Sequence, residues 1–99
     1  MTPWTLTVTT HDRTRTIMGT ADTTQKARRE MFIATGSLME RGGDERPRYE
    51  LSVGEQLVAI IQTGETARGF PDHVGAARML DQIAGVDDQV FAMHHGLGN

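Results

Sequence analysis

Residues 4–18 read WTLTVTTHDRTRTIM, and their pattern is the strongest indication of the fold in this sequence. Apolar and polar side chains alternate over residues 4–9, which is the period of a strand with one buried face. The alternation breaks at residues 10–13 and an extended run rich in β-branched side chains follows at residues 14–18. This order predicts a β-hairpin with one apolar face and one threonine-rich face.

The length of the hairpin loop decides where its arginines lie. A two-residue loop at residues 11–12 would place Leu6 opposite Ile17, and Arg13 and Arg15 would share the apolar face. A three-residue loop would move both arginines to the threonine face, because a shift of one residue turns every side chain over.

A helix is predicted after this hairpin. Residues 22–25, DTTQ, have the spacing of a capping box with Asp22 as the N-cap. Residues 42–43, both glycine, are expected to end the helix. One apolar stripe at helical spacing is expected to face the sheet: Ala27, Met31, Ala34 and Leu38.

The segment 48–64 allows two interpretations. Alternation over residues 49–53, followed by Gly54 and a β-branched apolar run, favours a second hairpin. Residues 52–55, SVGE, also fit a capping box, so residues 53–63 remain an alternative helix. We predict the hairpin.

The last third is predicted to be helical. Pro71 suits a first helical turn, Gly85 is expected to stop that helix, and a short last helix is expected to end near residue 93. Residues 94–99 are expected to form a flexible tail. The chain is therefore predicted to be one α+β domain, residues 1–99, with two β-hairpins in a small antiparallel sheet, helices on one face, and the order β-β-α-β-β-α-α.

The composition indicates the cellular compartment and the oligomeric state to expect. The 99 residues include no cysteine, and 37% are hydrophobic. A chain without cysteine has neither disulfides nor thiolate metal sites, which fits the cytoplasm. The longest apolar run, residues 57–61, is too short to cross a bilayer, so no membrane contact is expected. A core this small favours a homodimer.

Charge is distributed unevenly along the chain. Residues 1–29 hold five basic and two acidic side chains, whereas residues 30–99 hold five basic and eleven acidic ones. Nine of the ten basic residues are arginine, whose guanidinium forms forked contacts with phosphate and carboxylate groups.

Catalytic and metal-binding patterns are weak. The two serines, Ser37 and Ser52, are outside any nucleophile elbow, and the adjacent His94 and His95 cannot share one face of a helix or strand. No glycine-rich phosphate loop is present. We therefore expect no catalytic residues, no metal and no cofactor.

The basic first third supports a nucleic-acid hypothesis. Its order, W-x-L-x-V, a turn, T-R-T and a basic-faced helix, resembles the small sheet-reading domains at the N-terminus of tyrosine recombinases. The resemblance implies a sheet presented to the DNA groove with a helix behind it. It departs from those domains in the acidic remainder of this chain, which opposes phosphate binding. The candidate contact residues are Arg13, Arg15, Lys26, Arg28 and Arg29.

The leading hypothesis is a small non-enzymatic protein-interaction or regulatory module that acts as a homo-oligomer and binds another protein. Its apolar segment points to both faces of the predicted second hairpin, and methionines add adaptable apolar surface. The candidate interface residues are Leu57, Ala59, Ile61 and Met18. The alternatives are a nucleic-acid-binding protein that uses residues 4–29 and a small-molecule or nucleotide binder with arginines near a cleft between sheet and helix.

Overall fold

The predicted first hairpin is confirmed, and its register is the one expected for a two-residue loop. In the computed structural model, β1 (Thr2–Thr9) pairs antiparallel with β2 (Thr14–Ala21), and Leu6 lies opposite Ile17. The backbone amide of Thr10 donates to the carbonyl of Arg13 at 2.8 Å, which leaves residues 11–12 as the loop. The structure describes the backbone of residues 1–94 and the side chains of residues 1–86.

Helix α1 (Thr24–Glu40) begins one residue later than the capping box predicted. Its N-cap is Thr23, whose side chain accepts from the backbone amide of Lys26 at 3.1 Å. Asp22 lies outside the helix, with its carboxylate 4.0 Å from the Lys26 ammonium. The predicted end is confirmed, because Gly42 has a φ of 64° and its amide donates to the carbonyl of Met39.

The second hairpin is also confirmed, so residues 53–63 are not a helix. Strands β3 (Arg48–Val53) and β4 (Gln56–Gln62) flank a tight turn in which Gly54 has a φ of 61°. Their pairing shifts between Leu51 and Ser52, which leaves Val58 as a bulged residue of β4.

The predicted break at Gly85 is wrong. Helix α2 runs without interruption over His73–His94, so the expected third helix is absent from the described residues. Gly85 lacks the positive φ that a helix-ending glycine adopts, and a glycine within a helix costs only about 1 kcal/mol. Asp72 caps α2, since its carboxylate accepts from the amide of Gly75 at 2.9 Å. Of the predicted tail, His94 belongs to α2 and residues 95–99 lie outside the described part of the chain.

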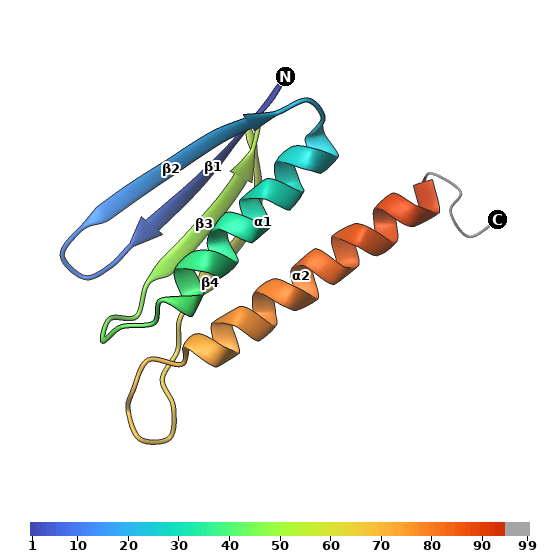
Figure 1. Cartoon of the computed structure of the whole chain (residues 1–99). Helices are drawn as coiled ribbons and strands as arrows, with labels where there is room; N and C mark the ends of the chain where they lie inside the picture. The colour runs from blue at the N-terminus through green and yellow to red at the C-terminus, as the bar shows by residue number, and fades with distance from the viewer. Residues whose placement is uncertain (95–99) are drawn as a thin grey trace.

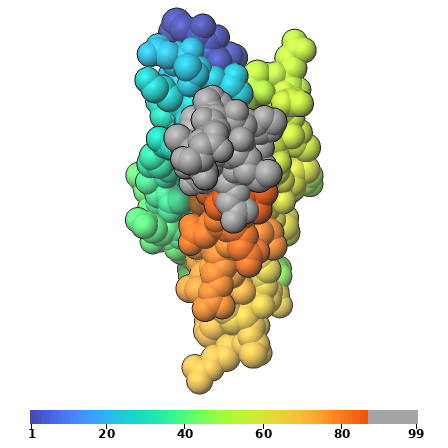
Figure 2. All heavy atoms as spheres, turned by 90° about the vertical axis from the view of Figure 1, so that its right-hand side faces the viewer, coloured from blue at the N-terminus to red at the C-terminus, as the bar shows by residue number. Residues whose placement is uncertain are grey.

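The sheet is fully antiparallel, has the order β2-β1-β3-β4, and carries both helices on one face (Figure 1). Helix α1 packs on β1, β2 and β3, whereas α2 packs on α1 and β4. Seen from the side of α2, that helix lies over the middle of the molecule and the β3–β4 hairpin stays visible beside it (Figure 2). This arrangement confirms the predicted α+β class.

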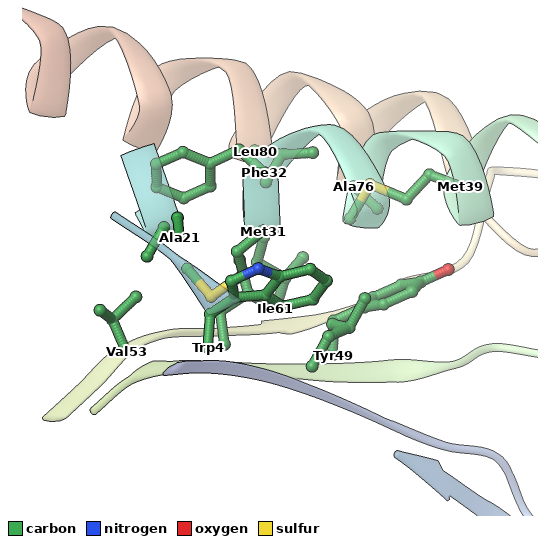
Figure 3. Packing of buried hydrophobic residues seen from close by; sticks show 13 residues of the cluster. Trp4, Ala21, Met31, Phe32, Met39, Tyr49, Val53, Ile61, Ala76 and Leu80 are labelled. Carbon is green, nitrogen blue, oxygen red and sulfur yellow. The ribbon is translucent and has the colours of Figure 1, made fainter. Parts of the chain in front are cut away.

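The core fills the space between the sheet and the two helices (Figure 3). The sheet contributes its inner-face side chains and the helices contribute one stripe each. Its buried hydrophobic members are Trp4, Leu6, Ala21, Ala27, Met31, Phe32, Met39, Tyr49, Leu51, Val53, Ile61, Ala76 and Leu80. No helix among the described residues is long and apolar enough to cross a membrane.

Candidate functional site

The face of the sheet opposite the helices is open. One row across it runs from Met18 through Thr5 and Ser52 to Leu57, and the next ends at Ile60. The middle of this outer face is polar, with three alternate threonines on β1 alone. Large apolar side chains therefore lie at its edges, which are the strands β2 and β4.

Strand β4 is an edge strand that carries neither charge nor proline, two of the usual protections of a sheet edge. Its sequence, QLVAIIQ, contains no charge and no proline. An edge strand directs alternate backbone N–H and C=O groups away from its neighbour, where a further strand can pair with them. The bulge affects Val58 alone, and residues 59–62 keep a regular register with β3. A regular, uncharged strand edge is therefore available for pairing.

The predicted interface residues do not form one patch. Leu57 and Ile60 face outward from β4 and are 57% and 44% exposed, respectively. Ala59 is half-buried, and Ile61 is fully buried in the core of its own chain. Met18 is 74% exposed but belongs to β2, at the opposite edge of the sheet. Sequence reasoning did not select Ile60, because strict alternation groups Leu57 with Ala59 and Ile61, whereas the bulge in β4 places Leu57 on the face of Ile60.

A cleft lies at the end of the sheet near the tip of the first hairpin. Arg15, Val8 and Tyr49 are neighbours in one inner-face row, and α1 ends above them at residue 40. Because the helix stops there, the loop 41–47 closes the space instead. The resulting hollow measures about 310 Å³. Its lining residues are Val8, Thr10, Arg13, Arg15, Leu38, Arg41, Gly42, Gly43, Asp44, Glu45, Pro47 and Tyr49. We call it the arginine cleft.

Three arginines at this cleft form no ion pair within the part of the chain that the structure describes. Among the described residues, Arg13, Arg15 and Arg41 have no carboxylate within salt-bridge distance. Asp44 and Glu45, on the closing loop, also lack an ion pair within that part of the chain. Arginine side chains thus outnumber carboxylates three to two at the cleft.

Tyr49 forms part of the cleft floor. Its side chain is almost fully buried, and its hydroxyl points away from the core cluster (Figure 3). Desolvation by burial raises the pKa of the Tyr49 phenol, so it stays a neutral donor at ordinary pH.

The closing loop is held in place from α2. Gly42 and Gly43 have φ values of 64° and 115°, a region that favours glycine, and they turn the chain back over the sheet. The Nε2 atom of His73 lies 2.9 Å from the carbonyl oxygen of Gly43. His73 therefore ties the start of α2 to the loop that shapes the cleft.

A larger hollow of about 660 Å³ lies beyond the same loop and shares Thr10, Asp44 and Glu45 with the cleft. The two arginines that line this larger hollow form ion pairs with glutamates of the chain. Arg46 pairs with Glu65, and Arg48 pairs with Glu50 at 3.3 Å. The unpaired guanidinium groups are thus on the side of the arginine cleft.

The five basic residues predicted to contact nucleic acid are divided between two places. Arg13 and Arg15 lie at the cleft with the C-terminal end of α1. Lys26, Arg28 and Arg29 lie in the first turns of α1, roughly 18 Å away along the helix axis. Lys26 is also close to Asp22. A nucleic-acid surface built from all five stays a prediction.

The structure adds a basic residue that the sequence did not select. Arg41 follows the last turn of α1 and joins Arg13 and Arg15 only because α1 returns along β2. The sequence could have indicated Arg41 through its position directly before Gly42, where the helix was expected to end. The described residues contain no group of three metal-ligating side chains of the His, Asp or Glu type that could hold a metal ion.

Comparisons of the chain with protein-family models, with curated proteins and with solved structures gave no match.

Proposed function

We propose that this protein is a non-enzymatic interaction module that forms a homodimer through strand β4 and presents the joined outer face to another protein. The observation that carries the proposal is the β4 edge, which is uncharged, free of proline and flanked by the exposed Leu57 and Ile60. Pairing with a second copy supplies partners for the backbone groups that β4 directs outward.

The faces of the strand restrict the register of the pairing. A two-fold axis perpendicular to the sheet keeps the helices of both copies on one side, so outward residues must meet outward residues. Centring the pair on Ile60 satisfies this condition and opposes Ala59 with Ile61 of the second copy. The result is a continuous eight-stranded sheet.

The joined sheet offers a surface for a partner. Leu57 and Ile60 of both copies lie near its middle, and the threonines of β1 lie further out on each side. An apolar centre within a polar rim is the composition of protein-binding surfaces. The partner is therefore expected to be a protein that docks on this face.

Substitution of Ile60 by lysine tests the pairing. Ile60→Lys places a charge on the edge, where lysine is a common means of preventing strand addition. We expect size-exclusion chromatography with light scattering to give a dimer for the parent chain and a monomer for the variant. Circular dichroism should be unchanged, since Ile60 points away from the core.

Met18→Lys is the matched control, because Met18 is an exposed apolar residue of the other edge strand. It should leave the dimer intact. A monomeric parent chain at high concentration, or a dimer lost only in Met18→Lys, contradicts the proposal.

A further inference from the structure

We infer that the arginine cleft binds a small organic anion, with its oxyanion group on the guanidinium groups and a flat apolar body on the cleft floor. The inference is independent of the pairing through β4, because none of the residues that line the cleft belongs to that strand.

The charged part of the cleft suits an oxyanion. Arg13 comes from the hairpin tip, Arg15 from β2 and Arg41 from the end of α1, so three different elements each contribute one arginine to the lining of the cleft. None of them is paired with a carboxylate of the described chain. A phosphate or carboxylate group can accept forked, charge-assisted hydrogen bonds from such groups.

The floor of the cleft suits an apolar body. Val8 and Tyr49 contribute from the sheet, Leu38 from the helix and Pro47 from the loop. The volume of about 310 Å³ is at the lower end of the range of small-molecule sites. The Tyr49 hydroxyl has no hydrogen-bond partner among the described residues and can donate to the ligand.

The two acidic side chains at the cleft should oppose the ligand. Asp44 and Glu45 lie on the closing loop and reduce the positive potential around the three arginines. Removal of their charges should therefore tighten the binding of an anion and weaken the binding of a cation. This sign makes the charge of the ligand testable.

The test is a titration of the full chain with phenyl phosphate. Binding is measured by isothermal titration calorimetry and by the chemical-shift changes of backbone amides in NMR spectra. We expect saturable binding of one molecule per chain, with shifts concentrated at Val8, Arg15 and Tyr49. Inorganic phosphate, which lacks the apolar body, should bind more weakly, and benzylamine, a cation of similar shape, should not bind.

Charge variants locate the site. Arg15→Gln should weaken phenyl phosphate binding by about tenfold, because a hydrogen bond to a charged group is lost. The double variant Asp44→Asn, Glu45→Gln should tighten it. Arg68→Gln removes the same charge from an exposed loop residue outside the cleft and should leave the dissociation constant unchanged.

Several results would overturn the inference. They are the absence of saturable binding, equal binding of inorganic and phenyl phosphate, and equal losses in Arg15→Gln and Arg68→Gln. Because Arg15 and Arg68 are both exposed, these variants are expected to fold.

Discussion

The two edge strands of the sheet, β2 and β4, differ in the charge that they carry. Strand β2 carries Arg15 near its start and contributes Ala21 to the buried core, so its edge carries a charge. Strand β4 carries no charge and anchors Ile61 at zero exposure. One edge therefore supplies a charged cleft beside the helix, whereas the other supplies a strand without charge or proline.

Helix placement accounts for part of this difference. Helix α1 packs across β1, β2 and β3 but ends before the sheet does, which leaves Arg15 under a loop. Helix α2 packs on β4. A helix above the inner face of an edge strand can bury an inward side chain such as Ile61 without pairing the backbone of the strand, so the edge of β4 stays open.

The largest expected effect concerns the two faces of β4. Ile61→Ala should lower the free energy of unfolding by about 2–5 kcal/mol, because it leaves a cavity in the core. Ile60→Ala, on the exposed face, should cost less than about 1.5 kcal/mol even with the loss of pairing. Urea unfolding of both variants at one fixed protein concentration measures the difference. Equal losses would contradict the assignment of the two faces.

The next effect tests the packing of β2. A β-carbon at Gly19 would overlap the indole of Trp4, so Gly19→Ala should destabilise the fold by about 1–3 kcal/mol. Gly64→Ala is the control, since no atom lies within 4 Å of the position that its β-carbon would take and its φ is outside the glycine region. The fluorescence of Trp4, the only tryptophan, should shift in the first variant alone. If both variants unfold at the same denaturant concentration, the close approach of β1 to β2 is wrong.

The smallest effect concerns Tyr49, which belongs both to the lining of the cleft and to the hydrophobic core. Burial raises the pKa of this phenol above its usual value of 10.0. Above that pH the unfolded chain releases a proton that the folded chain retains, so stability should be complete below pH 10 and fall as the pH rises above it. Tyr49→Phe should lack this part of the decline.

Tyrosinate absorbance follows this titration directly, since Tyr49 is the only tyrosine. A midpoint at the ordinary value in the folded chain would show that the phenol is solvated. The same alkaline decline in Tyr49→Phe would assign it to other groups.

The hairpins could be predicted from the sequence because they are local. Alternation on both sides of a short polar loop defines a register, and residues 11–12 and Gly54 are the turns that the pattern required. The helix ends were less predictable. Thr23 caps α1 in place of Asp22, and α2 continues through Gly85, because adjacent candidates compete by small energies that packing decides.

The candidate site could be predicted only in part. The register places Arg15 on the face of Val8, which is the outcome expected for one of the two loop lengths that the sequence allowed. The arrival of Arg41 beside it depends on where α1 ends relative to the sheet, which is a tertiary property. Likewise, strict alternation grouped Leu57 with the inward residues of β4, and the bulge that turns it outward is not visible in the sequence. Only the sheet order makes β4 an edge and places Met18 at the other one.

Disulfide trapping tests the pairing of β4 most directly, because the chain has no cysteine of its own. Directly opposed residues of antiparallel strands have Cα atoms about 4.5–5.5 Å apart, within the reach of a disulfide. Ile60→Cys is predicted to form a covalent dimer on mild oxidation of dilute protein, whereas Met18→Cys stays monomeric on a denaturing gel. A covalent dimer from Met18→Cys with none from Ile60→Cys would contradict β4 as the edge through which the chains pair.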